Sequence, residues 1–319
     1  MISTTSSMRL PPISEPANSP AMNDGTVTWG ELWNEVAERV PRPQARWLCE
    51  VASGHDGDEF LSIVDRPATQ RAVVHLDSML ARVDAGEPLQ YVLGRWGFRH
   101  LDLMVDRRVL IPRPETETVV EVALRRARSM SAPIVCADLG TGSGAIGLSL
   151  AAELPVDGVT VWMTDSSSGA LDVARANIAG IGRSASNVRV AHGDWFAALP
   201  QELRGQLAVV VSNPPYVADD DPELEPIVRD WEPEAALFGG TDGLDAIRLL
   251  VAEARTWLRP GGWLVIEIGS SHGDRVGELL HAVDFDEVEI VKDLSGHDRV
   301  AVGRRAAVSG ETDGDLAEQ

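Results

Sequence analysis

The stretch IVCADLGTGSGAIGLSLAAEL occupies residues 134–154 and is the strongest indication of the fold class of this chain. It opens with a short apolar run, continues with three glycines at Gly140, Gly142 and Gly144, and ends in a run of good helix formers. A buried strand that leads through a glycine turn into a helix is the repeating unit of a parallel α/β sheet. We therefore predict a strand over Ile134–Leu139 and a helix over Ala145–Leu154.

The alternation of strand and helix continues on both sides of this unit. Further helices are predicted at Glu115–Met130, Gly169–Ile181, Gly243–Leu258 and Asp274–Val283. Further strands are predicted at Val159–Thr164, Val188–His192, Leu207–Ser212, Trp263–Ile268, Val288–Val291 and Arg299–Val302, the last two as an antiparallel edge hairpin. The pattern predicts an α/β fold with a doubly wound, mostly parallel, seven-stranded sheet. Ligands of such sheets bind beyond the carboxyl ends of the strands, where the strand order reverses.

The sequence before this region predicts a second, smaller domain. Residues 28–88 are predicted to form a helical bundle, opened by a capping box of Thr28 and Glu31. Its later helices are expected at Ala45–Ala52, Glu59–Val64 and Thr69–Asp84, with Pro41, Pro43 and Pro67 as breaks. Residues 89–110 are predicted to form a β-hairpin linker between Tyr91 and Val109, and residues 111–304 form the α/β domain. Residues 1–27 and 305–319 are polar and are predicted to be a disordered extension and a disordered tail.

The composition narrows the range of possible partners. The chain has 49 acidic and 28 basic residues and a formal net charge of -21. Nucleic-acid binders gain most of their affinity from Lys and Arg, so direct nucleic-acid binding is not expected. The two cysteines, Cys49 and Cys136, have no metal-ligand spacing, so no metal is expected. Sparse cysteine and the lack of a long apolar stretch or signal peptide predict a cytoplasmic protein without a membrane span.

The glycine turn is a candidate ligand site. Glycines let the backbone approach a ligand closely, and the unpaired N–H groups of the following helix point at the same place. Asp165 ends the next predicted strand, where a carboxylate can accept hydrogen bonds from ribose hydroxyls. After the third strand, Asp194 is placed to face an adenine amino group and Trp195 to lie against an adenine ring. Gly142, Gly144 and Gly147 also fit GxGxxG, so the turn alone leaves a dinucleotide site open.

The tetrapeptide Asn213-Pro214-Pro215-Tyr216 follows the fourth strand. Two prolines make a stiff loop without N–H donors of its own. The groups that remain are acceptors, namely the Asn213 side-chain oxygen and the carbonyl of Pro214. Such a loop suits a substrate NH₂ group, which offers two donors, and Tyr216 can pack on the flat face of an amide or a base.

These residues, together with several others, resemble one family. The matching stretches are Leu110-Ile111-Pro112-Arg113-Pro114-Glu115-Thr116-Glu117, Asp138–Gly144, Asp165-Ser166, Gly193–Phe196, Ser212–Tyr216, Trp231-Glu232-Pro233, Pro260-Gly261-Gly262 and Asp293–Gly296. The chain resembles the HemK/PrmC type of protein-(glutamine-N5) methyltransferase, which modifies the glutamine of the Gly-Gly-Gln motif in peptide chain release factors. This chain departs from the usual family sequence at Ala208, Ser143 and His272.

The resemblance implies a Rossmann-like domain that uses S-adenosylmethionine and a helical domain that docks the release factor. It implies cofactor contacts from Gly140, Thr141, Gly142, Ser143, Gly144, Asp165, Asp194, Trp195 and Asn213. It implies that Asn213, Pro214, Pro215 and Tyr216 hold the glutamine and carry the catalysis, and that Arg113 and Glu115 frame the pocket. Glu115 also suits a helix N-terminus for electrostatic reasons alone.

Three other functions are compatible with parts of this pattern. A different protein glutamine, for example in a ribosomal protein, would fit the same loop. Adenine in DNA would fit it too, although the acidic balance disfavours DNA. An NAD-dependent oxidoreductase would need a hydride-handling residue, which the Asn213–Tyr216 loop does not offer.

Overall fold

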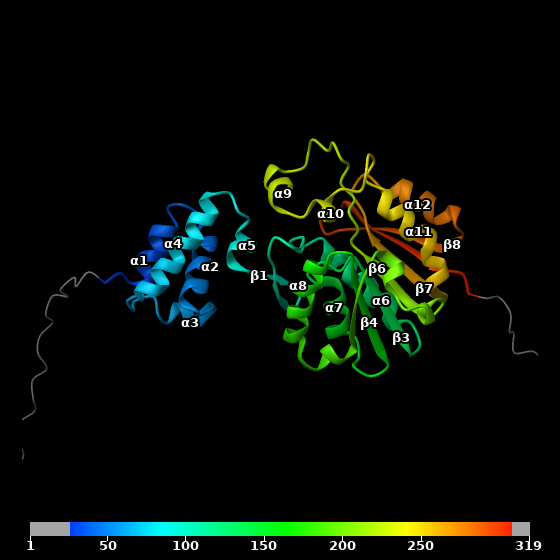
Figure 1. Ribbon diagram of the computed structural model, residues 1–319, viewed down its shortest axis with the longest axis horizontal. Helices are drawn as coiled ribbons and strands as arrows, with labels where there is room; N and C mark the ends of the chain where they lie inside the picture. Colours follow the sequence, from blue (N-terminus) through cyan, green and yellow to red (C-terminus); the bar gives the residue numbers. More distant parts are fainter. Residues whose placement is uncertain (1–25, 308–319) are drawn as a thin grey trace, which may run out of the picture. The chain divides into compact units, whose positions relative to one another are not determined.

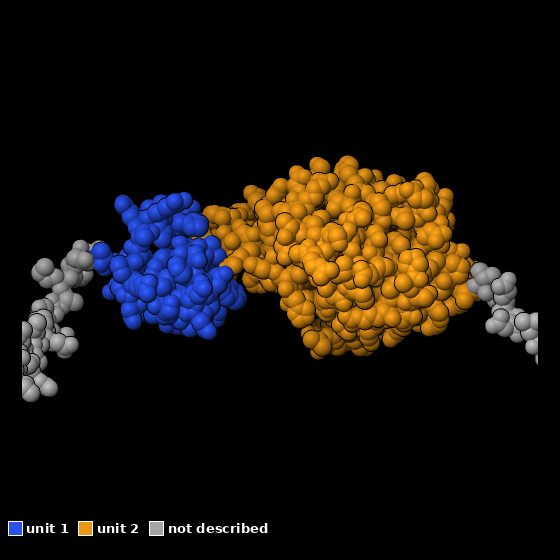
Figure 2. All heavy atoms as spheres, turned by 90° about the horizontal axis from the view of Figure 1, so that it is seen from below, with its two compact units in different colours: residues 1–78 blue, residues 79–319 orange. Residues whose placement is uncertain are grey.

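The computed structural model describes residues 26–307, and this part of the chain divides into two compact units after Ser78 (Figure 2). The division falls within helix α4 (Gln70–Asp84), before the end of the helical domain predicted at residue 88. The predicted terminal extensions lie almost entirely outside the described residues, although strand β9 continues to Arg305. No helix among residues 26–307 is long and apolar enough to cross a bilayer.

The first unit is helical, as its sequence predicts. It contains α1 (Trp29–Val36), α2 (Arg42–Ser53), α3 (Gly57–Leu61) and the first part of α4. The capping box is confirmed, because the Thr28 backbone N–H donates to Glu31 Oε2 at 2.8 Å and the Glu31 N–H donates to Thr28 Oγ1 at 3.3 Å. Pro43 was predicted to break the chain, but it lies in the first turn of α2. A proline is tolerated there because that turn has no intrahelical acceptor for its missing N–H.

The second unit contains the predicted sheet (Figure 1). Its strands in this sheet are β3 (Ile134–Leu139), β4 (Val159–Asp165), β5 (Val188–His192), β6 (Leu207–Ser212), β7 (Leu258–Glu267), β8 (Phe285–Lys292) and β9 (Asp298–Arg305). Their order is β5-β4-β3-β6-β7-β9-β8, with β8 and β9 antiparallel to each other and β9 antiparallel to β7. The doubly wound, mostly parallel seven-stranded fold is therefore confirmed.

One helix precedes the first strand of this sheet, and others connect its parallel strands. They are α6 (Thr116–Arg128), α7 (Ala145–Glu153), α8 (Ser168–Ile178), α11 (Asp245–Trp257) and α12 (Gly273–Ala282), with short 3-10 turns at Ala179–Asn187, Trp195–Ala198 and Gln201–Leu203. Two short helices were not predicted, α9 (Pro226–Trp231) and α10 (Glu234–Leu237). The sequence there is rich in proline and acidic residues and lacks helical periodicity, so tertiary contacts determine its conformation.

The predicted hairpin is present but shorter than expected. It pairs β1 (Arg95–Phe98) with β2 (Leu101–Met104), whereas Tyr91 lies in the short helix α5 (Leu89–Leu93). The Tyr91 hydroxyl donates to the carbonyl of Val109 at 2.6 Å, and the residue is buried. Tyr91 therefore ties this segment to the chain that leads into α6.

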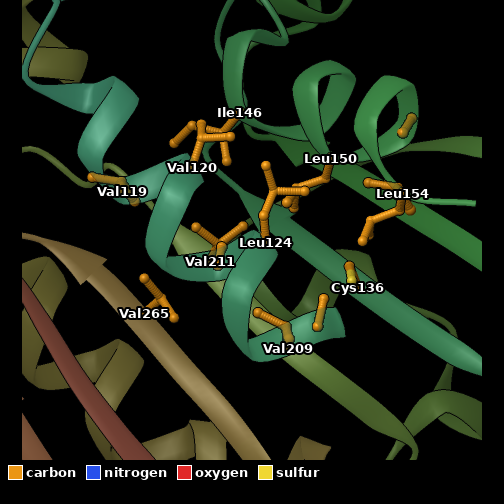
Figure 3. Close-up of a cluster of buried hydrophobic side chains, with 14 of the residues drawn as sticks. Val119, Val120, Leu124, Cys136, Ile146, Leu150, Leu154, Val209, Val211 and Val265 are labelled. Carbon is orange, nitrogen blue, oxygen red and sulfur yellow. The ribbon is translucent and has the colours of Figure 1, made fainter. Parts of the chain in front are cut away.

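The core of the sheet fixes the relative positions of β3 and β6. Side chains of α6 pack on this part of the sheet, with Leu124 near Cys136, Val209 and Val211 (Figure 3). The Ser212 hydroxyl donates to the Leu139 carbonyl at 2.6 Å, which ties the ends of the two strands together. The chain runs from β3 outward through β4 and β5 and then returns to β6 on the other side of β3. The loops after β3 and β6 therefore meet at the point where ligands of such sheets bind.

Candidate active site

The glycine loop after β3 has the conformation that its sequence predicts. Gly140, Gly142 and Gly144 have φ of +73°, +55° and +90°, a region that side chains with a Cβ rarely enter. A Cβ on Gly140 would lie 3.2 Å from the Trp195 ring. The indole therefore packs directly against the loop, and Trp195 itself has a positive φ of +43°. Its unfavourable backbone conformation is held by this packing and by the turn after β5.

Asp165 holds the glycine loop from the neighbouring strand. Its Oδ2 accepts the backbone N–H of Gly142 at 2.9 Å, and its Oδ1 accepts the N–H of Ser167 at 2.8 Å. An ionised carboxylate has about four acceptor positions. Two remain for a ligand, so Asp165 can orient the loop and bind ribose hydroxyls at the same time.

Asp138 is a buried acid in this site to which the sequence analysis gave no role. Its Oδ2 accepts from Thr141 Oγ1 at 2.5 Å and from the Gly147 N–H at 2.9 Å, while its Oδ1 has no partner among the described residues. Burial raises the pKa of Asp138 to about 7, although these hydrogen bonds act to lower it. The Asp138 side chain thereby links the glycine loop to the first turn of helix α7.

The raised pKa of Asp138 has a consequence for stability. Between pH values of about 4 and 7 the folded protein holds a proton that the unfolded chain has released, so this group stabilises the fold most at low pH and loses that effect as pH rises. We expect the free energy of unfolding of the wild type to fall relative to Asp138→Asn over this range, by up to about 1.4 kcal/mol per pH unit. Urea unfolding at several pH values measures the difference. Parallel pH dependences of the two proteins would contradict it.

A cavity of about 220 Å³ lies over the glycine loop, and we call it the first cavity. The predicted cofactor residues that line it are Gly140, Thr141, Gly142, Ser143, Asp165, Asp194, Trp195 and Asn213. Gly144 does not line it. It is the N-cap of α7, and a Cβ there would come within 3 Å of Met163 and Leu148. The tertiary structure therefore gathers the acids after β4 and β5 and the asparagine after β6 around one space.

A second cavity of about 270 Å³ adjoins the first, and Asn213, Leu110 and Ala236 line both. Tyr216, Arg113 and Glu115 line only the second cavity, and Pro215 lines only the first. Pro214 is buried and lines neither. Acidic side chains of the loop before α9 complete the second cavity, namely Asp221, Glu223 and Glu225. Asn213 thus lies between a cavity lined by predicted cofactor residues and a cavity lined partly by acidic side chains.

Tyr216 is anchored by a second buried acid that the sequence analysis did not assign. Its hydroxyl donates to Glu267 Oε1 at 3.0 Å, from the end of strand β7. Burial raises the pKa of Tyr216, and the nearby charge of Glu267 raises it further. The phenol therefore stays protonated and remains a donor to the carboxyl group. A glutamate at the end of an apolar strand was the available signal, but only the fold shows that it faces the tyrosine.

A glycine-rich loop supports the Asn213–Tyr216 segment from behind. Val217 donates its N–H to the Leu237 carbonyl at 2.9 Å, and Gly239 donates to the Val217 carbonyl at 2.8 Å. A Cβ on Gly239 would lie 2.5 Å from the Pro215 carbonyl oxygen, and one on Gly243 would overlap the Tyr216 carbonyl oxygen. These two glycines are required by the close approach of two backbones.

Arg113 and Glu115 differ in how they are held. Arg113 pairs with the buried carboxylate of Glu232 at 2.5 Å, and the other oxygen of Glu232 accepts the Ile111 N–H at 3.1 Å. This ion pair holds the loop before α6 against the chain after α9. Glu115 begins α6 without a side-chain cap bond and remains partly exposed beside the second cavity.

Two of the three family departures, Ala208 and His272, line neither cavity. His272 packs against Gly243 and Gly269, behind Tyr216, and its Nδ1 is buried without a partner among the described residues. Burial lowers the pKa of His272, and the charge of Arg275 lowers it further. Ala208 is a fully buried residue of β6. Ser143 lines the first cavity.

Two family models match the chain: the methyltransferase small domain over residues 127–229 and the PrmC N-terminal domain over residues 34–94. The release factor glutamine methyltransferase of Xylella fastidiosa is 42% identical over 273 residues, which cover 86% of this chain and 96% of that protein. The enzyme of the same name from Geobacter sulfurreducens is 38% identical over 278 residues, which cover 87% and 94%. A solved structure, the release factor-specific protein-(glutamine-N5) methyltransferase from Alicyclobacillus acidocaldarius, is 30% identical, covers 61% of this chain and 94% of its own, and has a TM-score of 0.38. Identity at this level over nearly the whole length shows that the chain belongs to the family of release factor glutamine methyltransferases.

Proposed function

We propose that this protein transfers a methyl group from S-adenosylmethionine to the side-chain amide nitrogen, N5, of the glutamine in the Gly-Gly-Gln motif of peptide chain release factors. The observation that carries the proposal is the position of Asn213 between two adjoining cavities. The first has the residues of a nucleoside site, and the second is lined by Asn213 and Tyr216, the first and last residues of the Asn213–Tyr216 loop. The membership of the chain in this enzyme family supports the same reaction.

The residues around the first cavity fit S-adenosylmethionine. Asp165 has free acceptor positions for ribose hydroxyls, the glycine loop leaves room for the chain of the ligand, and Trp195 offers a flat face to adenine. Asp194 can accept from the adenine amino group. When bound, this cofactor supplies a methyl group on a positively charged sulfur, which is a strong electrophile.

We assign the clamp to Asn213, Pro214, Pro215 and Tyr216. An amide nitrogen is a poor nucleophile, because its lone pair is delocalised into the carbonyl group. Acceptors on Asn213 and Pro214 can hold both N–H bonds of the substrate and so direct the nitrogen lone pair. Orientation of this kind can reduce a barrier by roughly 7–11 kcal/mol. The same acceptors stabilise the positive charge that grows on nitrogen during transfer.

The clamp also explains the choice of glutamine over glutamate. A carboxylate has no donors at neutral pH, so it would face only acceptors and leave buried groups unpaired.

We assign Arg113 and Glu115 to the wall of the second cavity, where Asp221, Glu223 and Glu225 favour a substrate segment with positive charge. Because the chain has a formal net charge of -21, we propose a protein partner and no direct nucleic-acid contact. Two free, buried cysteines suit the cytoplasm.

Mass spectrometry of an unmodified release factor, incubated with this protein and S-adenosylmethionine, tests the proposal. We expect one added methyl group on the glutamine of Gly-Gly-Gln, and none when that glutamine is changed to Ala or Glu. Bound cofactor without any added methyl would refute the release factor as substrate. A methyl group on an adenine of added DNA would favour the DNA alternative.

Asp165→Ala tests the cofactor site separately. Hydrogen bonds to a charged group contribute about 1.5–3 kcal/mol each, so we expect the affinity for S-adenosylmethionine to fall at least about 10-fold. Isothermal titration calorimetry measures it, and Asp172→Ala, on the exposed face of α8, is the control. Unchanged affinity in Asp165→Ala would remove this residue from the cofactor site.

A further inference from the structure

The Asn213 amide can serve as an acceptor only if its oxygen faces the substrate. An asparagine side chain has an oxygen and an NH₂ group of nearly equal shape, and the surrounding hydrogen bonds decide which group faces which way. In this structure the Nδ2 of Asn213 donates to Thr116 Oγ1 at 3.4 Å. The oxygen is thereby left for the cavities that Asn213 lines.

The Thr116 hydroxyl can accept from Asn213 only if its own proton is directed elsewhere. Glu267 is the group placed to take it, because its carboxyl group interacts with the Thr116 side chain, and this interaction lowers the pKa of Glu267. An ionised carboxylate only accepts, so its presence forces the threonine to donate to it and to turn a lone pair toward Asn213. Glu267 is fully buried, and its Oε2 has no hydrogen-bond partner among the described residues, so this oxygen lacks a donor that the Thr116 hydroxyl can supply.

The same carboxyl group holds the other end of the clamp. Tyr216 donates to Glu267 Oε1 at 3.0 Å, so one buried acid holds the last residue of the clamp directly and interacts with Thr116, which accepts from the first residue. Thr116 begins α6 and Glu267 ends β7, on two elements that flank the Asn213–Tyr216 loop.

We propose that Glu267 is a positioning residue for the methyl transfer, which sets the direction of the Asn213 amide through the Thr116 hydroxyl and fixes the Tyr216 ring. The proposal rests on the function proposed above. It adds Thr116 and Glu267, which lie outside the Asn213–Tyr216 loop, to the residues that position the substrate. Only the ionised form of Glu267 imposes the direction, since a protonated carboxyl group can donate to Thr116 and release it.

The surroundings of Glu267 set the pH at which its carboxyl group ionises. Burial raises the pKa of Glu267 to about 7, the interactions with Thr116 and Tyr216 and the charge of Arg299 lower it, and the charge of Glu115 raises it. Arg299 lies on β9 and pairs with Asp293 at 3.3 Å, and Glu115 begins α6. The transfer rate is therefore expected to rise with pH through the region near 7.

Four variants of the full-length chain test the proposal: Thr116→Val, Thr116→Ser, Glu267→Gln and the double variant Thr116→Val with Glu267→Gln. We expect Thr116→Val and Glu267→Gln each to lower kcat at least about 10-fold with nearly unchanged affinity for S-adenosylmethionine. Thr116→Ser, which keeps the hydroxyl, should restore most of the rate. The double variant should be no slower than the slower single variant, because both changes break one chain of hydrogen bonds. Thr164→Val is the matched control, since the buried Thr164 hydroxyl has no partner among residues 26–307.

A second readout does not depend on activity. In spectra of protein labelled with ¹⁵N on asparagine, the side-chain NH₂ signal of Asn213 should titrate near pH 7 in the wild type and in Thr116→Ser, and should not in Glu267→Gln. A wild-type kcat in Thr116→Val, or an Asn213 signal that ignores Glu267, would overturn the proposal. Failure of the wild type to methylate the release factor would instead refute the proposed function, and the NMR titration would still decide the role of Glu267.

Discussion

Asn213→Ala is expected to lower the rate of methyl transfer by at least about 100- to 1000-fold, the usual cost of removing one group that stabilises developing charge. The variant loses the side-chain acceptor that lies between the two cavities, so the substrate amide is no longer held at both N–H bonds. Single-turnover transfer to an unmodified release factor measures the effect.

The affinity for S-adenosylmethionine should change much less in this variant. The glycine loop, Asp165 and Trp195 all lie on other strand ends and do not depend on the Asn213 side chain for their contacts. Calorimetric titration of the cofactor is therefore the control measurement. A wild-type transfer rate would end the proposed role of Asn213, and an equal loss of cofactor affinity would make it a cofactor ligand only.

Gly243→Ala is expected to lower the transfer rate by about 100-fold, although the residue lies 27 positions from Tyr216 in the sequence. A Cβ at this position would overlap the Tyr216 carbonyl oxygen and lie 3.0 Å from the His272 ring. Since the Tyr216 carbonyl belongs to a stiff loop with two prolines, the loop has to move as a unit. A displacement of about 1 Å at the reacting groups is enough for a loss of this size.

Gly205→Ala is the matched control for this variant. Gly205 has a φ of +75° and Gly243 one of +71°, so alanine meets a similar backbone penalty at both positions. A Cβ on Gly205 has nothing within 4 Å. The two variants should therefore lose similar stability from the backbone, while only Gly243→Ala loses the activity. Equal kcat values in the two variants would show that the loop behind the clamp does not position it.

The sequence predicted the fold because each strand of the sheet carries its own local signal. Three strands, at Ile134–Leu139, Val188–His192 and Leu207–Ser212, have the predicted bounds, since each is a short run with apolar residues that ends at a turn or loop. The misses lie where local signals conflict with tertiary contacts. Tyr91 lies in a helix from which its hydroxyl reaches Val109, and α9 and α10 form from residues without helical periodicity.

Short segments of the sequence specify which groups are available to the site: the glycines after β3, the acids at the ends of β4 and β5, and the proline loop after β6. These are properties of short segments, because glycine, proline and strand ends act on their immediate neighbours. Which distant groups hold them in place depends on the folded arrangement of the whole chain. Asn213 reaches Thr116, Tyr216 reaches Glu267, and Arg113 reaches Glu232, across 97, 51 and 119 residues of chain. The raised pKa values of Asp138 and Glu267 also come from burial, and burial depends on the packing of the whole sheet.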